Sequence, residues 1–526
     1  MNWDFPYASR RMPVLAEHVV ASSQPLAVQA GLSMMARGGS AVDAAIAAAA
    51  VLTVVEPVMN GLGSDTLAIV WDGSAVRGLT GCGRSPRAWT PERFAGRSRM
   101  PAEGWDSVTV PGGVSAWMAL AEMGARLPWP VLMEPAIRYA REGFLVSPQI
   151  ARLWARQVPR LRGQPGFAAA FLPQGRAPLP GERFRLPVLG DTLGRIADTQ
   201  GRDFYEGRSA RLLAAHAREH GGALSMDDLA AQRAEWVVPM HGDYRGLRVH
   251  ELPPNSQGLA VLIALGILAH FELGPDVAPD QRAHLQIEAM KMAFADVYAH
   301  LADPDAMAVP PDWLLEPAYL AQRAREVSLH RAGNYGARPL PGGGTVYLAA
   351  ADGGGLMVSL IQSNYHGFGS GVVVPESGIS LNNRGSGFVL QLGHPNRVAG
   401  GKLPFHTIIP AMLTRGGRPL AALGVVGADM QPQGQVQVIC ALADLGLNPQ
   451  AALDMPRWRI DDAGMLRLEA HFDAGVAQAL AARGHPVKSA SALDDLDFGG
   501  AQLIVRSGEG YVGASEPRRD GAAAGF

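Results

Sequence analysis

The sequence predicts a mixed α/β (α+β) protein whose first part is rich in helices and whose last part is rich in strands. Helical apolar spacing dominates the chain up to residue 338, and strand-like runs dominate from residue 345. A Pro- and Gly-rich linker at 339–344 separates the two parts. Among 526 residues 48% are hydrophobic and 18% are charged, so the chain can bury a large core.

The first elements are two helices and a strand. Proline at position 25 suits a first helical turn, and the helix is expected to run to residue 37 and stop at Gly38 and Gly39. Ser40 and Asp43 then form a capping-box pattern. The segment 41–55 is apolar nearly all round, which is typical of a helix buried between layers. A glycine-rich turn and a strand at 66–71 follow.

The remaining elements follow from the same signals. Residues 81–117 are expected to form loops, and 152–226 to form helices on the outside. Further helices are expected at 114–127, 131–143, 259–268, 280–300, the first part of 316–338 and 433–445. Strands are expected at 244–252, 345–351, 356–362, 372–374, 407–414 and 420–426.

Composition excludes several classes of function. A net charge of −2 provides no basic surface for nucleic acid or an anionic membrane. The two cysteines, Cys82 and Cys440, cannot make a disulfide framework, and no Cys/His spacing resembles a zinc site. Residues 1–16 lack the apolar core of a secretory signal, and the longest apolar stretch, 44–55, is shorter than the ~20 residues that span a bilayer. A cytoplasmic protein is expected.

The stretch Gly342-Gly343-Gly344-Thr345 is the candidate reactive feature. Three glycines precede a hydroxyl residue that opens an apolar run. This layout suits a chain that cuts itself before Thr345, because the freed α-amino group can then act as base to the Thr345 hydroxyl. Taken alone, the same residues also fit a plain loop before a strand.

Several ordered motifs resemble the γ-glutamyltranspeptidase family of N-terminal-nucleophile hydrolases. After Thr345 they are Phe368-Gly369-Ser370-Gly371, then 376–383, and the chain end at 511–518. Before it they are 38–45, Glu56-Pro57 with Gly61-Leu62-Gly63-Ser64-Asp65, and 284–296. The resemblance covers nearly the whole chain in the family's order. It implies a four-layer αββα sandwich.

The resemblance also implies the chemistry. Cleavage between Gly344 and Thr345 would give a large chain, 1–344, and a small chain, 345–526, with Asp352 at the matching distance behind the nucleophile. Thr345 would attack an amide carbonyl and form an acyl-enzyme, and the N–H groups of Gly427 and Ala428 would hold the oxyanion. No cofactor or metal is implied. The partners are a small-molecule amide and the two chains of one precursor; whether two such pairs form a homodimer stays open.

The expected substrate pocket departs from that of the transpeptidases. The family's arginine for the substrate α-carboxylate falls at Cys82, or at Arg84 if the loop shifts, and the acid for the α-amino group falls at Gly387. His406-Thr407 replaces a serine pair, and the short 388–402 segment predicts no lid loop. These changes favour hydrolysis of another acyl amide, as in acylases or oxamate-type amidohydrolases, whereas the family name favours γ-glutamyl transfer from glutathione-type donors.

Other polar residues near these motifs have both functional and structural interpretations. Asn364, Ser363 and Asn383 could bond substrate or Thr345, or could order turns and strand ends. His406 could serve the pocket, and Tyr347 and Asp429 are expected in supporting roles.

Two rival hypotheses remain. Pairing of His366 or His406 with Ser370 or Ser377 would make a serine hydrolase, but no G-x-S-x-G elbow is present. An unprocessed relative that binds a ligand without catalysis is the other rival.

Overall fold

The computed structural model describes residues 11–336, 343–491 and 496–526. Two seven-stranded sheets form its centre, and every neighbouring pair within them is antiparallel. The first sheet has the order β1 (Val14–Ala16), β20 (Gly510–Ser515), β19 (Gly500–Ser507), β15 (Arg418–Val426), β14 (Ala411–Arg415), β9 (Leu247–Glu251), β8 (Met240–Tyr244). The second has the order β21 (Ala522–Gly525), β2 (Val19–Ser22), β10 (Gly344–Ala351), β11 (Met357–Tyr365), β3 (Asp65–Trp71), β4 (Val76–Gly81), β7 (Glu235–Val237).

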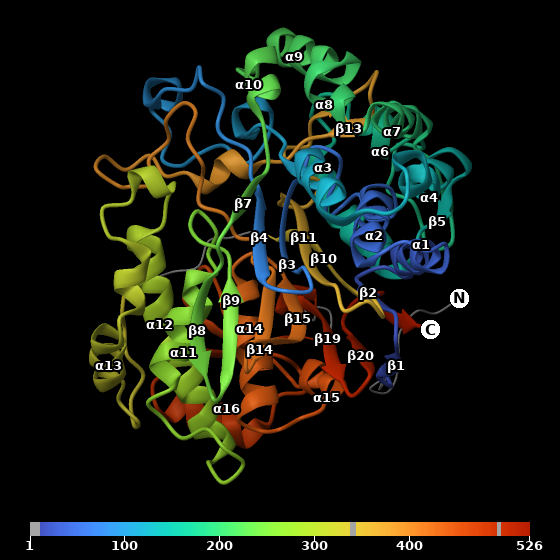
Figure 1. The fold of residues 1–526 in the computed structure, drawn as a ribbon. Coiled ribbons are helices and arrows are strands. Elements are labelled where there is room, and N and C mark those ends of the chain that lie inside the picture. The colour runs from blue at the N-terminus through green and yellow to red at the C-terminus, as the bar shows by residue number, and fades with distance from the viewer. Residues whose placement is uncertain (1–10, 337–342, 492–495) are drawn as a thin grey trace.

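Helices cover the outer faces of both sheets (Figure 1). The second sheet is covered by α1 (Pro25–Ala36), α2 (Ala41–Val55) and α3 (Gly113–Gly124). The first sheet is covered by α11 (Leu259–Leu268), α12 (Pro279–His300) and α14 (Met430–Ala443). The other helices are α4 (Trp129–Glu142), α5 (Pro148–Leu161), α6 (Phe167–Phe171), α7 (Pro187–Thr199), α8 (Arg202–Glu206), α9 (Arg208–Glu219), α10 (Met226–Ala231), α13 (Pro317–Glu326), α15 (Pro449–Asp454) and α16 (Ala474–Ala482).

Small sheets complete the list of strands. They are β5 (Phe144–Leu145) with β6 (Arg183–Phe184), β12 (Val373–Val374) with β13 (Ile379–Ser380), and β16 (Trp458–Ile460) with β17 (Leu466–Leu468) and β18 (Val487–Ser489). The predicted αββα sandwich is therefore confirmed. Among the described residues no helix is both long and apolar enough to cross a membrane.

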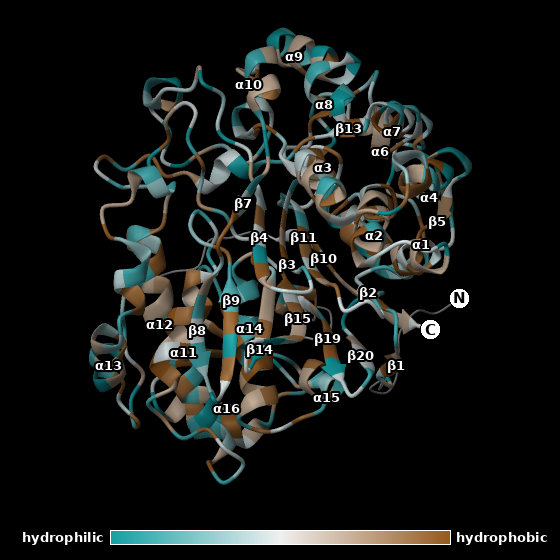
Figure 2. Ribbon diagram, in the orientation of Figure 1, coloured by the Kyte–Doolittle hydropathy of each residue, from teal (hydrophilic) through white to brown (hydrophobic). Residues whose placement is uncertain are grey.

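Three buried clusters separate the four layers. One packs α1–α3 on the second sheet, one packs α11, α12 and α14 on the first, and one lies between the sheets. Strand β10 shows how alternation divides them, because Val346 and Leu348 face the helices whereas Tyr347 and Ala349 face the other sheet. In Figure 2 the hydrophilic colour is frequent on α8 and α9, at the rim of the molecule.

Most predicted elements are confirmed, and the exceptions have physical causes. Helix α2 is buried along its whole length and begins with the predicted Ser40–Asp43 capping box. The predicted strand 244–252 is confirmed as β9 but starts later, because the chain turns at Arg245, whose φ is 50°, and Gly246, which join it to β8 in a hairpin. The strand expected from residue 407 begins only at Ala411, because the carbonyls of Thr407 and Ile408 accept from the side chains of Gln257 and Ser256 instead of from a strand. In the two large sheets, strands β1, β2, β4, β7, β8 and β19–β21 were not predicted.

The two halves of the sequence do not form separate domains. The second sheet takes β2, β3, β4 and β7 from before residue 344 and β10, β11 and β21 from after it. The predicted linker 339–344 lies outside the described residues up to Gly342. Because each large sheet needs strands from both parts, cutting the chain at residue 344 would leave two interlocked chains.

Candidate active site

Thr345 lies near the start of β10, in the interior of the second sheet. Its side chain is nearly fully buried, with 2% exposure. The pairing of β10 with β11 is regular from Val346 onward but shifts between Gly344 and Val346. Such irregularities re-aim side chains and are frequent beside active sites. Here the irregularity falls on the predicted nucleophile.

Ser363 on β11 links the Thr345 hydroxyl to the peptide bond in front of it. Its Oγ lies 3.1 Å from Thr345 Oγ1 and donates to the carbonyl oxygen of Gly344 over 2.6 Å. It also accepts from the backbone N–H of Tyr365 over 2.9 Å. Ser363 Oγ therefore lies next to both the predicted attacking hydroxyl and the carbonyl of the predicted scissile bond.

Only glycine fits at residue 344. A Cβ built there would lie 2.7 Å from the carbonyl carbon of His366 and 2.8 Å from the amide nitrogen of Gly367. Those are backbone atoms, which cannot rotate away as a side chain would. The glycine before Thr345 is thus a packing requirement rather than only a source of flexibility.

A buried charged group lies behind Ser363. Arg384, which is fully buried, donates from Nη2 to Ser363 Oγ over 3.2 Å and from Nη1 to Thr407 Oγ1 over 2.9 Å. Asp65 Oδ2 lies 3.9 Å from Arg384 Nε and 3.0 Å from His406 Nε2. Sequence reasoning missed Arg384 as a site residue and cited Asp65 only within a motif. An arginine among small residues in 382–388 was the available signal.

His406 is neutral in this environment. Burial, and secondarily the charge of Arg384, lowers its pKa to about 4. Its Nδ1 accepts from the N–H of Ile408 and its Nε2–H donates to Asp65, which agrees with one neutral tautomer. His406 thus hydrogen-bonds to Asp65, and Thr407 accepts a hydrogen bond from Arg384. Both predicted residues therefore belong to the polar network of the site.

The turn at Gly427 and Ala428 connects β15 to α14. Both residues have positive φ, 120° and 51°, and Ala428 is held there by Gln257, whose amide donates to its carbonyl over 3.1 Å. The carbonyl of Gly427 accepts from the N–H of Met430, so the N–H of Ala428 points away from the helix. A Cβ on Gly343 would lie 3.6 Å from the Gly427 carbonyl carbon. The turn therefore lies against the residues before the scissile bond, where oxyanion donors are needed.

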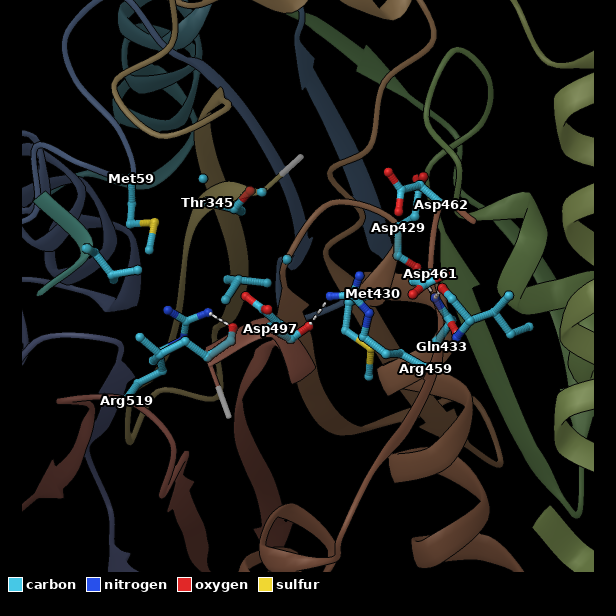
Figure 3. Close-up of a pocket in the computed structure, with 17 residues that line it drawn as sticks. Met59, Thr345, Asp429, Met430, Gln433, Arg459, Asp461, Asp462, Asp497 and Arg519 are labelled. Carbon is cyan, nitrogen blue, oxygen red and sulfur yellow. Dashed lines mark hydrogen bonds between the residues drawn. The ribbon is translucent and has the colours of Figure 1, made fainter. Parts of the chain in front are cut away.

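A cavity of about 280 Å³ opens beside Thr345 (Figure 3). The cavity is lined by Gly343, Gly344 and Gly427, together with polar side chains from β16 and the residues after it and from the last part of the chain. The charged lining residues are Asp429, Asp461, Asp462, Asp497, Arg459 and Arg519. Asp429, predicted as supporting, is buried and starts α14.

Other predicted residues lie outside this network. Arg84 pairs with Asp303 over 3.0 Å and bonds the carbonyl of Gly401, so the structure does not bring it to Thr345. The Cys82 thiol lies instead beside Asp65, and burial raises its pKa well above the usual range. Which of Cys82 and Arg84 takes the place of the family's arginine therefore stays a prediction.

The remaining candidates have structural partners. Asn364 accepts from the Ser64 hydroxyl, and Asn383 joins the N–H of His366 to the carbonyl of Ala102. The Tyr347 hydroxyl bonds Ser359 between the sheets.

Two further predicted features also have structural roles. Asp352 accepts from the N–H of Ala41 at the start of α2. Ser370 and Ser377 donate to backbone carbonyls, and His406 is engaged with Asp65, so the serine-hydrolase pairing with His406 is not formed.

One cluster of metal-ligand type lies elsewhere in the described residues. His284, Glu288 and His485 place their ligand atoms within 4.8 Å of one another. However, His284 Nδ1 and His485 Nε2 share a hydrogen bond of 2.8 Å, and Lys291 Nζ lies 2.5 Å from Glu288 Oε1. These contacts give the cluster a structural explanation, in which α12 is joined to the loop after α16.

Comparisons with known proteins agree with this geometry. The family model described as Gamma-glutamyltranspeptidase matches residues 27–526. A glutathione hydrolase-like YwrD proenzyme of Bacillus subtilis is 38% identical over 520 residues, which cover 97% of this chain and 98% of that protein. An oxamate amidohydrolase proenzyme of Klebsiella pneumoniae is 36% identical over 515 residues, 95% of this chain and 97% of that one. The crystal structure of a cephalosporin acylase from Bacillus halodurans superposes with a TM-score of 0.95 at 44% identity, covering 100% of this chain and 99% of that one.

Proposed function

The chain is an enzyme of the γ-glutamyltranspeptidase family, and on that premise we propose that it cuts itself before Thr345 and then hydrolyses an amide through that residue. The observation that carries the proposal is the hydroxyl arrangement at the strand start. Thr345 Oγ1 lies beside Ser363, which donates to the Gly344 carbonyl. Two relatives are named as proenzymes, which supports the formation of two chains from one precursor.

The proposed turnover uses the freed amine of Thr345 as base. It accepts the Thr345 hydroxyl proton while Oγ1 attacks the substrate carbonyl, and the N–H groups of Gly427 and Ala428 stabilise the oxyanion. The proton then passes to the leaving amine, which departs and leaves an acyl-enzyme. Water releases the acyl group by the same steps in reverse order. An amine in place of water would give transfer instead of hydrolysis.

For the substrate, we propose an acyl amide without a free α-amino group near the scissile carbonyl. Arg384 holds a buried positive charge one hydroxyl away from Thr345, and the family's amine-binding acid is replaced by Gly387. At residue 387 an ammonium group would therefore find no carboxylate partner, so this element of the family's α-amino site is missing. The similarity to a cephalosporin acylase and to an oxamate amidohydrolase points the same way.

Glutathione-type γ-glutamyl cleavage is the second candidate. It is favoured by the name of the Bacillus subtilis relative, a glutathione hydrolase-like proenzyme. The Thr345 mechanism is the same, so the two candidates differ only in the pocket.

Two experiments test these proposals. A denaturing gel of the purified chain should show fragments 1–344 and 345–526, whereas Thr345→Ala should stay whole; an intact wild-type chain would contradict self-cleavage. A side-by-side assay should then compare glutaryl amides, oxamate and γ-glutamyl anilide. Preference for the γ-glutamyl compound would reject the acyl-amide assignment while leaving the Thr345 mechanism in place.

A further inference from the structure

Arg384 is an unusual side chain to find beside a nucleophile. It is fully buried, and its guanidinium stacks 4.4 Å from the centre of the Tyr365 ring. Two of its hydrogen bonds go to the neutral hydroxyls of Ser363 and Thr407. Burying an arginine is costly unless its charge is matched, so its position requires an explanation.

Among the described residues, the carboxylate that faces the guanidinium is that of Asp65, and it does not hydrogen-bond to it. Asp65 Oδ2 lies 3.9 Å from Arg384 Nε, too far for a hydrogen bond. Its other oxygen accepts from the N–H groups of Gly83 and Gly112, and Oδ2 bonds His406. Among the described residues Arg384 Nε has no hydrogen-bond partner. The positive charge is therefore only partly balanced, and its bonded N–H groups point toward the hydroxyls.

The hydrogen bonds at Ser363 show what this arrangement does. A hydroxyl has one proton and two lone pairs. The N–H of Tyr365 and Nη2 of Arg384 occupy the two lone pairs. The single proton must then be donated, and the carbonyl oxygen of Gly344 at 2.6 Å is its nearest acceptor.

We propose that Arg384 is a positioning residue for self-cleavage, which directs the Ser363 proton to the Gly344 carbonyl and, through that hydroxyl, brings its positive charge to bear on the oxyanion that forms there. This inference rests on the proposed self-cleavage. Mature turnover is proposed to use the Gly427–Ala428 turn instead, so the chain would have separate stabilising groups for maturation and for substrate.

The step balances as an N→O acyl shift followed by hydrolysis. Thr345 Oγ1 bonds the carbonyl carbon of Gly344, the carbon–nitrogen bond breaks, and the hydroxyl proton goes to the Thr345 nitrogen, which becomes the free amine. Water then attacks the ester, giving its hydroxide to the Gly344 carboxyl group and its remaining proton to Oγ1. Negative charge develops on the Gly344 carbonyl oxygen in both parts, at the Ser363 hydroxyl.

The test measures cleavage rates of full-length chains made by cell-free translation and followed by denaturing gel during a chase. Arg384→Gln keeps donors but removes the charge, and it should slow cleavage about 100-fold, the cost typical of losing an oxyanion-stabilising donor. Arg384→Lys keeps the charge but loses the planar guanidinium, so its cleavage rate should lie between those of the wild type and Arg384→Gln. Arg323→Met, which removes a largely buried arginine paired with Asp296 on the outer helices, is the matched control and should cleave at the wild-type rate.

A double-mutant cycle separates this role from a merely structural one. If Arg384 acts through Ser363, the double variant Ser363→Ala/Arg384→Gln should cleave no more slowly than Ser363→Ala alone. Additive losses, or wild-type cleavage by Arg384→Gln, would overturn the inference. Resistance to brief proteolysis shows whether each variant is folded. If Arg384→Gln is not folded, the same comparison is made with Arg384→Lys, alone and combined with Ser363→Ala. Failure of the wild type to cleave would instead reject the proposed function itself.

Discussion

Substituting Gly344 by alanine should slow maturation roughly 100-fold, whereas the same substitution at Gly343 should not. The added methyl group would lie 2.7 Å from the carbonyl carbon of His366 and 2.8 Å from the nitrogen of Gly367. Carbon atoms pack at about 3.5 Å, so the strand start must shift by about 0.8 Å. The hydrogen bond from Ser363 to the Gly344 carbonyl, now 2.6 Å, would lengthen or break.

The expected effect on rate follows from that displacement. A misplacement on the order of 1 Å at a reacting centre costs roughly 100-fold, and the overpacking itself should destabilise the chain by about 1–3 kcal/mol. The assay is the same translation chase, with a thermal melt of the intact chain.

Gly343→Ala is the matched control for Gly344→Ala. Its Cβ would make an ordinary contact of 3.6 Å with Gly427, so it should cleave close to the wild-type rate. Equal cleavage by both alanine variants would refute the reasoning, because it would mean that contact with His366 and Gly367 does not fix the scissile carbonyl.

Three further predictions concern the described core. Glu251 is fully buried and burial raises its pKa, so the folded chain keeps a proton that the unfolded chain loses. The free energy of unfolding should therefore fall above about pH 4.5 by up to about 1.4 kcal/mol per pH unit. Glu251→Gln should reduce this pH dependence, measured by urea unfolding at a series of pH values. His406, with its pKa lowered to about 4, acts oppositely: the unfolded chain binds a proton first, so stability should fall from about pH 6.5 to pH 4 by about 3 kcal/mol, and His406→Gln should reduce that loss. Tyr347→Phe should cost about 1 kcal/mol, for the lost bond to Ser359, without slowing cleavage; a cleavage defect would give Tyr347 a direct role.

The sequence alone predicted local structure correctly wherever a single hydrophobic periodicity or a helix-capping residue dominates a segment. The run 41–55 is apolar on every side and capped by Ser40, so it could only be a buried helix. The strands at 345–351 and 356–362 were predicted close to their observed bounds. By contrast, the hairpin at Arg245 was missed, because an arginine at positive φ carries no turn signature.

At the site, the sequence predicted Thr345 as the nucleophile and the bond before it as the one that is cut, and both stay predictions. The ordered family motifs on either side supported them, because three glycines before a hydroxyl residue also fit a plain loop. The confirmed family resemblance extended this to the turn at Gly427. Of the pocket residues predicted from it, Arg84 is paired with Asp303, and the resemblance did not single out Arg384, which lies behind Ser363 near Asp65.

Only the tertiary structure could decide those partners. Asp65 and Arg384 are more than 300 positions apart, and they meet because β3 and β11 are neighbours in one sheet while the segment after β13 folds back over the ends of both. A charged residue's role depends on what surrounds it once water is excluded, and sequence spacing carries no record of that. The sequence alone predicts that Thr345 begins a strand. Only the fold brings the charge of Arg384 behind Ser363, next to Thr345.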